Sequence, residues 1–374
     1  MKLNSALIAS LSLFLSGTSA KNIFDADRPS KNPGSPGNPG NLGNPGNGTD
    51  GTNGNNGNPG FYNGHRKWQL GKQTSRYASA ADCDFDLDIQ IFDGMGRTKF
   101  KPDKKACKKG KSFVGSVNNG KTHITLVPSK GVEGAFTASV TDVDTGAVYS
   151  IRPDANGDMI VVKRMQEDYD EVEEDAIDPM DEEGITLYSQ EDPSGGSLRG
   201  SSEGNNKNRA LQTKTTIDVL VLWTADAECG HSDLGSSCSR TAQTEANIRG
   251  LIDLAVQETN AAYDLSGVKI ELRLAHAAYT DHTSSSVTSA LHALTNNGDG
   301  DMDEAHSLRT QYGADVVQLI TGETFSGIGV GWKGPRKDRM FSVSRYSYAI
   351  GYYTFGHEIG HNMVGLFSWY DYLA

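Results

Sequence analysis

Apolar and polar positions alternate over several short runs between residues 61 and 165. A period of two is typical of β-strands that have one covered face. The pairs Asn119-Gly120 and Asn156-Gly157 lie between such runs and favour tight hairpin turns. Strands are predicted at residues 84–91, 113–117, 123–127, 135–140, 147–151 and 159–162. We therefore expect a small all-β domain in this part of the chain.

From residue 215 onward, strand-like runs alternate with helix-like ones. Residues 217–223 are almost continuously apolar, as in a strand that is covered on both faces. Residues 244–263 carry apolar side chains at helical spacing, and Ser266-Gly267 follows as a stop signal. Further strands are predicted at 270–278, 316–321, 327–332 (an edge strand) and 341–346, and further helices at 286–294, 302–312 and from Tyr353 onward. This alternation predicts an α/β fold.

The N-terminus has the order of a secretory signal peptide. Lys2 is followed by an apolar run over residues 6–15 and by small residues up to Ala20. The apolar run is about ten residues long, too short to span ~30 Å of hydrocarbon. We expect residues 1–20 to be a signal peptide and the mature protein to be secreted and extracellular, without an integral membrane segment.

Two further segments have the composition of linkers. Residues 21–60 are rich in Gly, Asn and Pro, which predicts a flexible spacer, and Asn47 begins the glycosylation sequon of that spacer. Residues 166–210 are first acidic and then polar, which predicts an exposed linker with Arg199 and Arg209 as candidate processing positions. The folded regions are then 61–165 and 211–374.

The charge balance limits the class of partner. The chain carries 35 Lys and Arg against 47 Asp and Glu, a formal net charge of −12. Nucleic acids and anionic membranes attract a basic face, so this balance argues against a nucleic-acid partner. It leaves the oligomeric state open.

The last predicted helix contains the sequence His357-Glu358-Ile359-Gly360-His361. Positions i and i+4 lie on one face of a helix, so His357 and His361 can converge on one metal ion. Glu358 projects beside them, where a carboxylate can take a proton from a metal-bound water. The motif predicts a Zn²⁺ site with hydrolytic chemistry.

Residues 354–363, with the sequence TFGHEIGHNM, resemble the active-site helix of reprolysin-like (adamalysin-type) metzincin zinc metalloendopeptidases. Residues 217–223, 258–268 and 303–317 resemble other segments of that family, and residues 115–164 more weakly resemble the β-rich propeptide of its bacterial-type members. The resemblance implies a metzincin-like catalytic domain with a mixed twisted sheet. It also implies a zymogen whose inhibitory propeptide is removed before activity.

The same resemblance assigns roles to individual residues. It implies that His357 and His361 are zinc ligands, that Glu358 is the general base, and that protein or peptide substrates are cleaved. The edge strand at Gly327, Ile328 and Gly329 would hold an extended substrate by β-addition.

The resemblance stops after Met363. Metzincins continue as H-E-x-x-H-x-x-G-x-x-H, but Val364 and Phe367 occupy the positions of the glycine and the third histidine. In this tail, Asp371 is the acidic residue that would have to replace the third histidine as a zinc ligand. We expect residues 364–374 to lie outside the family's sequence, as if the family's chain were truncated at this point.

The four cysteines allow two interpretations. The spacing of Cys229 and Cys238 favours a local disulfide in a loop, which leaves Cys83 and Cys107 to pair with each other. Alternatively, a thiolate of the propeptide-like region caps the zinc as a cysteine switch.

The sequence supports two alternative functions. The first is a secreted zinc metalloendopeptidase precursor that cleaves internal peptide bonds by zinc-activated water. The second is a non-catalytic extracellular binding protein, derived from a metzincin that lacks the third zinc ligand.

Overall fold

The computed structural model describes residues 60–62, 65–69, 83–91, 97–129, 135–165, 214–235, 238–283, 285–322, 327–334 and 336–363. These residues belong to one compact unit, Gly60–Ala374, and the predicted signal peptide and spacer lie outside the described residues, apart from Gly60. Among the described helices, none is long and apolar enough to cross a membrane.

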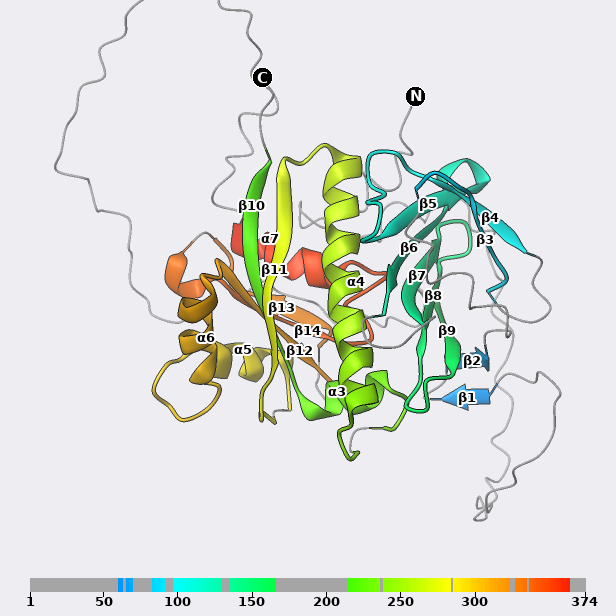
Figure 1. The fold of residues 1–374 in the computed structure, drawn as a ribbon. Coiled ribbons are helices and arrows are strands. Elements are labelled where there is room, and N and C mark those ends of the chain that lie inside the picture. Colours follow the sequence, from blue (N-terminus) through cyan, green and yellow to red (C-terminus); the bar gives the residue numbers. More distant parts are fainter. Residues whose placement is uncertain are drawn as a thin grey trace, which may run out of the picture. The chain divides into compact units, whose positions relative to one another are not determined.

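The first part of this unit is an antiparallel sheet, called the N-terminal sheet here (Figure 1). Its strands follow the order β1-β2-β9-β8-β7-β6-β5-β4-β3, so that most neighbours are joined by short hairpins. A short 3₁₀ turn, η4 (Asn118–Gly120), connects β5 and β6 at one of the predicted asparagine-glycine turns. The strands are β1 (Gly60–Tyr62), β2 (His65–Gln69), β3 (Leu87–Ile89), β4 (Thr98–Pro102), β5 (Phe113–Val117), β6 (Thr122–Pro128), β7 (Phe136–Asp142), β8 (Ala147–Pro153) and β9 (Met159–Met165).

The second part contains a five-stranded mixed sheet, called the C-terminal sheet. Its order is β11-β10-β12-β14-β13, with parallel pairing throughout except for the antiparallel edge strand β13. The strands are β10 (Thr215–Trp223), β11 (Ile270–Tyr279), β12 (Val316–Thr321), β13 (Gly329–Gly331) and β14 (Phe341–Arg345). The mixed α/β character expected from the sequence is thus present, and the edge position of β13 agrees with its prediction.

Helices cover both faces of the C-terminal sheet. Successive residues of β10 point to opposite faces, so Val221 packs with α4 and α7 while Leu222 packs with α5 and α6. Burial on both sides explains the nearly continuous apolar run in this strand. The helices are α3 (Ala225–His231), α4 (Ala242–Ser266), α5 (Val287–Thr295), α6 (Glu304–Tyr312), α7 (Thr354–Met363) and the 3₁₀ turn η6 (Lys337–Arg339).

Helix α4 contacts both sheets (Figure 1). Ile248, Leu251 and Ile252 lie in the core of the C-terminal sheet, whereas Ala261 packs into the core of the N-terminal sheet. The helix begins with a capping box between Thr241 and Thr244 and ends at a left-handed glycine, as the stop signal predicted.

Some local predictions were wrong. The strand expected over residues 84–91 is restricted to Leu87–Ile89, because Cys83–Phe85 form a turn that a disulfide joins to Cys107. Strand β4 was missed, since its alternation is carried by Lys and Thr around one buried Phe100. Helix α3 was also missed, and Cys229 lies on this helix rather than in a loop.

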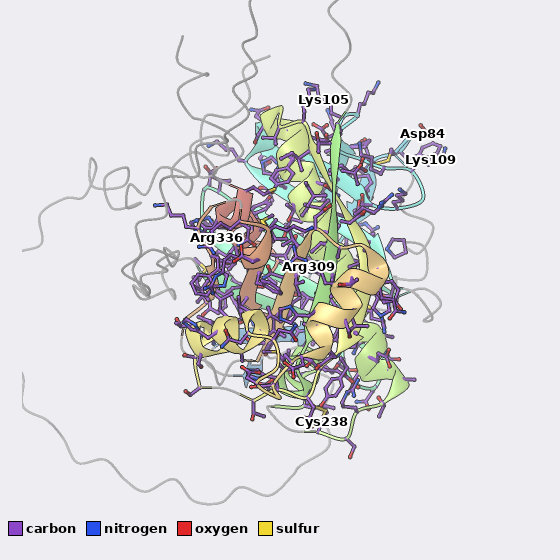
Figure 2. The ribbon with its side chains drawn as sticks, turned by 90° about the vertical axis from the view of Figure 1, so that its left-hand side faces the viewer. Asp84, Lys105, Lys109, Cys238, Arg309 and Arg336 are labelled. Carbon is purple, nitrogen blue, oxygen red and sulfur yellow. A yellow bond between two sulfur atoms is a disulfide. The ribbon has the colours of Figure 1, made fainter. Side chains whose placement is uncertain are left out.

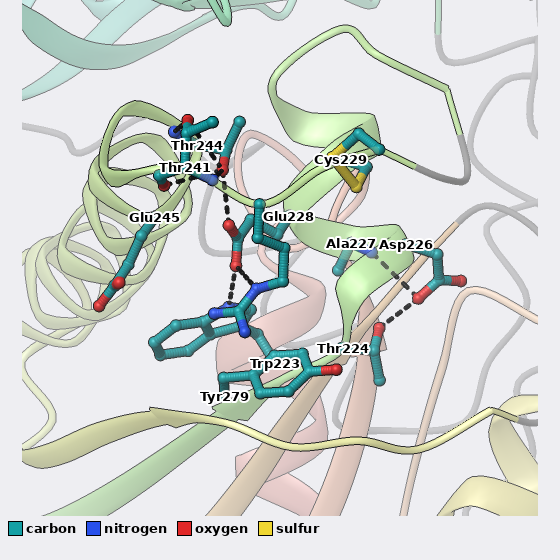
Figure 3. Close-up of polar contacts among 12 residues, drawn as sticks. Trp223, Thr224, Asp226, Ala227, Glu228, Cys229, Thr241, Thr244, Glu245 and Tyr279 are labelled. Atoms are coloured by element: carbon teal, nitrogen blue, oxygen red, sulfur yellow. Dashed lines mark hydrogen bonds and ion pairs between the residues drawn. A yellow bond between two sulfur atoms is a disulfide. The ribbon is translucent and has the colours of Figure 1, made fainter.

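A buried carboxylate organises the junction of α3 and α4 (Figure 3). Glu228 is fully buried and accepts hydrogen bonds from Trp223 Nε1 (2.8 Å), Arg240 Nε (2.8 Å) and Thr244 Oγ1 (2.6 Å). The guanidinium of Arg240 also stacks over the ring of Tyr279, 3.6 Å from its centroid. Glu228 therefore links the end of β10 to the start of α4 through its hydrogen bonds, and to the end of β11 through Arg240.

We predict that Glu228→Gln lowers the free energy of unfolding by about 2 kcal/mol, because charge-assisted hydrogen bonds are replaced by neutral ones. The matched control is Glu245→Gln, whose i, i+4 ion pair with Arg249 is half-buried, and this substitution should cost less than about 0.5 kcal/mol. Urea unfolding followed by tryptophan fluorescence measures both variants. Equal effects of the two substitutions would contradict the role given to Glu228.

Candidate active site

Helix α7 carries the HExxH sequence and is fixed against the C-terminal sheet by its other face. Phe355, Ile359 and Met363 are buried in the core shared with α4. Asn362 donates from Nδ2 to the carbonyl oxygens of Trp332 (2.8 Å) and Phe341 (3.0 Å), at the edge of the sheet. These contacts fix the rotation of the helix and so determine where its histidines point.

His357 and His361 come together on the remaining, partly exposed face of α7. Their Nε2 atoms are 2.9 Å apart, and their rings are nearly perpendicular, with centroids 4.5 Å apart. Two ring nitrogens that converge in this way can be bound by one ion, since zinc–nitrogen bonds are about 2.0–2.1 Å long.

Both imidazoles are held neutral. Burial lowers the pKa of His357 to about 4, and the neighbouring His361 contributes to the shift. Burial and the charge of Lys333 lower the pKa of His361 to about 4 as well. At neutral pH each ring therefore keeps a nitrogen lone pair, the form that binds a metal.

Glu358 lies beneath the edge strand β13 and is buried. A Cβ added at Gly329 would meet Glu358 Oε1 and Thr354 Cγ2, both at 2.6 Å. A Cβ at Gly331 would lie 2.7 Å from the backbone oxygen of Glu358. The two glycines thus let the edge strand approach the helix closely enough to place Glu358 beside it.

The three predicted substrate-binding residues lie along this edge. Gly329 is the first residue of β13. It pairs with Ser344 of the neighbouring strand β14, which runs antiparallel to β13. Gly327 and Ile328 precede the strand, and the carbonyl oxygen of Ile328 accepts the backbone N–H of Arg345 at 2.8 Å. Gly327 has a φ of +83°, which favours glycine, and a Cβ there would meet Val287 Cγ2 at 2.6 Å.

Within the described ranges, no third His, Cys, Asp or Glu joins the two histidines to form a metal-binding group. Val364, Phe367 and Asp371 lie outside the described residues, as does the predicted glycosylation site Asn47. The donor set on α7 therefore fits a zinc ion with two imidazole ligands and an adjacent carboxylate.

The cysteines form two disulfides, Cys83–Cys107 and Cys229–Cys238. With both pairs joined, the chain has no free thiol, so the cysteine switch is excluded. Cys83–Cys107 lies beside the exposed ion pair of Asp84 and Lys109, and Cys238 lies at the far end of the unit (Figure 2).

Sequence reasoning missed two residues near the site. Asn362 lies within the sequence that resembles the family's active-site helix. Its role in holding α7 to the edge strand depends on a contact with Trp332, 30 positions away. Lys333 follows β13 and is exposed, and its charge acts on His361. Its proximity to the HExxH helix follows only from the fold.

Helix α7 presents the HExxH arrangement, in which two histidines on one helical face flank a carboxylate. Residues 250–365 match the family model described as "Metallo-peptidase family M12B Reprolysin-like", which spans α4 to α7. This match confirms the resemblance to reprolysin-like metallopeptidases that was read from the sequence. The match does not include the N-terminal sheet, whose role as a propeptide stays a prediction.

Curated relatives carry the name "Peptidyl-Asp metalloendopeptidase". The chain is 36% identical to one from Stenotrophomonas maltophilia strain R551-3 over 40% of its own length and 33% of the relative's. It is 30% identical to one from strain K279a (58% of the chain, 46% of the relative) and 29% identical to one from Xanthomonas campestris pv. campestris (62% and 49%). The chain thus spans between a third and a half of the relatives' lengths.

The two lowered pKa values predict how the metal-free protein responds to acid. Below about pH 6.5 the unfolded chain takes up protons on His357 and His361 that the folded chain does not, so folding stability falls from about pH 6.5 down to about pH 4. Urea midpoints of the chelator-treated protein should decrease over this range, and less so in the His357→Gln/His361→Gln variant. Other groups, such as buried His231, titrate in both proteins and cancel in the comparison. Identical slopes in the two proteins would refute the prediction.

Proposed function

We propose that this protein is a secreted zinc metalloendopeptidase, made as a zymogen, that hydrolyses internal peptide bonds. The observation that carries the proposal is the convergence of His357 and His361 beside Glu358 at the edge of a mixed sheet. The signal-peptide pattern of residues 1–20 supports secretion, and the linker composition of residues 166–210 supports processing.

The residues of α7 have separate tasks in this mechanism. His357 and His361 would hold a zinc ion through their converging Nε2 atoms. When bound, the ion would supply Lewis-acid polarisation of a water molecule and of the scissile carbonyl. Glu358 takes the proton that the attacking water loses and delivers it to the leaving amine. Strand β13, the last strand of its sheet, accepts an extended substrate on its outer edge and aligns the substrate backbone with the helix.

We predict that Glu358→Gln lowers kcat by about 10²–10⁴-fold, the usual contribution of a general base. Zinc content should stay unchanged, because the histidines remain. Cleavage of a fluorogenic peptide after the linker has been cut, together with elemental analysis, measures both quantities. Glu245→Gln, a substitution of a half-buried glutamate on α4, is the matched control. Activity that is indifferent to both Glu358→Gln and a chelator would exclude a zinc peptidase.

A second candidate function is a non-catalytic binding protein that uses the edge strand. It is favoured by one observation: in the described part of the chain, two metal ligands stand together rather than three. Zinc titration of the full chain separates the candidates, since a bidentate site binds zinc weakly. Tight binding of one zinc per chain supports the enzyme, and weak or absent binding supports the binding protein.

We further propose that the peptidase prefers substrates with an aspartate at the cleaved bond. The relatives' name provides the substrate class, and Lys333 provides a cation at the end of β13, close enough to lower the pKa of His361. An exposed ammonium can attract a substrate carboxylate at modest strength.

Lys333→Gln should lower kcat/KM for an aspartate peptide relative to its asparagine counterpart by roughly fivefold, the worth of ~1 kcal/mol for an exposed ion pair. Lys337→Gln, on the exposed turn η6, is the control and should leave the ratio unchanged. Parallel kinetics on the two peptides give the ratio directly. An unaltered ratio in Lys333→Gln would remove Lys333 from substrate selection.

A further inference from the structure

We propose that the N-terminal sheet is a lasting partner of the metallopeptidase part and stays bound as a separate chain after the linker at residues 166–210 is cut. This departs from the released propeptide that the family resemblance implies. The inference rests on the proposed function only for the cut itself, and it is tested by measuring association rather than activity.

The N-terminal sheet contacts helix α4 through the face that the polar and apolar alternation of β7 predicts to be exposed to solvent. Along β7, Phe136, Ala138 and Val140 fill the core of the N-terminal sheet, and the intervening Thr137 and Ser139 point to the other face. Polar residues at these positions are typical of a solvated face. Yet Thr137 and Ser139 are 0% and 2% exposed, because helix α4 covers them. The polar face is therefore an interface.

Gly250 shows that α4 is adapted to this contact. It lies in the middle of the 25-residue helix, where glycine costs roughly 1 kcal/mol relative to alanine. A Cβ at Gly250 would lie 2.6 Å from Thr137 Oγ1 of β7. The absence of a side chain at Gly250 is thus needed for the sheet to approach the helix, although glycine lowers the intrinsic stability of the helix.

Glu258 joins the sheet, α4 and the segment that leads into α7. Its carboxyl group receives hydrogen bonds from Ser139 Oγ at 2.5 Å and from the backbone N–H of Gly351 at 2.8 Å. Desolvation raises the pKa of Glu258 to about 7, despite both hydrogen bonds. If the sheet left, this carboxyl group would lose Ser139, and Gly351 would lose its contact with the sheet.

The segment before α7 is held by the sheet at further points. Thr141 Oγ1 donates to the carbonyl oxygen of Gly351 (3.3 Å), and Arg164 donates to that of Ser347 (3.1 Å). A Cβ at Gly351 would lie 2.3 Å from Val148 Cγ1 of β8, so the backbone of this segment lies directly on the sheet. The N-terminal sheet thereby supports the entry to the active-site helix.

Other hydrogen bonds extend the interface to α3 and the start of α4. Arg152 donates to the carbonyl oxygen of His231 at 2.6 Å, and Asn247 donates to that of Asp154 at 2.9 Å. The backbone N–H of Ala155 donates to the carbonyl oxygen of Ser232 at 3.0 Å. Direct hydrogen bonds of this kind are typical of specific complexes between separately soluble proteins. Such complexes remain associated without a covalent link.

The experiment uses the full chain with a recognition sequence for a specific protease inserted in the 166–210 linker. After cutting, size-exclusion chromatography with light scattering at about 1 μM protein should show a single 1:1 complex of the two fragments. Hydrogen exchange should show the Gly351 amide as protected as in the uncut chain. Separate elution of the fragments, whether the larger one stays folded or aggregates, would overturn the proposal.

A pair of substitutions tests whether the α4–β7 contact holds the complex. Gly250→Ala favours the helix but places a methyl group against Thr137, so the Kd of the cut protein should rise at least tenfold. Thr137→Ala alone should change the Kd less than threefold, and Gly250→Ala/Thr137→Ala should return it to within threefold of the unsubstituted value. A Gly250→Ala protein that binds as tightly as the parent, or a double variant that stays weak, would refute this contact as the basis of retention. Peptidase activity plays no part in either readout.

Discussion

The structure depends on the burial of helix α4 on nearly all sides. A helix at the surface of a domain exposes one face to water, but α4 packs against the C-terminal sheet, α7 and the N-terminal sheet. Buried polar residues of α4 form hydrogen bonds to its neighbours: Asn260, for example, donates to the carbonyl oxygen of Leu272 (2.8 Å) and accepts its N–H (2.7 Å). Strand β11 and the helices α3 and α7 are placed directly against this helix.

The position of α7 follows from that arrangement. Gly356 of α7 lies against Thr259 of α4, where a Cβ would meet Thr259 Oγ1 at 2.7 Å. On its other side the helix is held by Asn362 and by the close approach of the glycines in β13. These contacts leave the two histidines on the partly exposed face and Glu358 between the helix and the edge strand. The site is thus formed where two glycine-mediated contacts allow backbones to come close.

The sequence predicted most elements of the C-terminal sheet because their signals are local. The strand predicted over residues 316–321 has the same bounds as β12, and the helix predicted over 244–263 falls short of α4 by a few residues at each end. The predictions that went wrong concern elements with weak local signals. Strand β4 carries a single buried apolar side chain, and α3 is short and held by Glu228 through contacts with distant Arg240 and Thr244.

By itself, the sequence determined the chemistry: the i, i+4 spacing of His357 and His361 places both on one helix face whatever surrounds them, because helical geometry is local. Only the tertiary structure decided what lies around that face. The neutral state of the imidazoles depends on burial by distant residues, and the contact of Gly329 with Glu358 depends on an edge strand some 30 positions away. The polar face of β7 was decided in the same way, because alternation separates the two faces of a strand but does not say which of them another element covers.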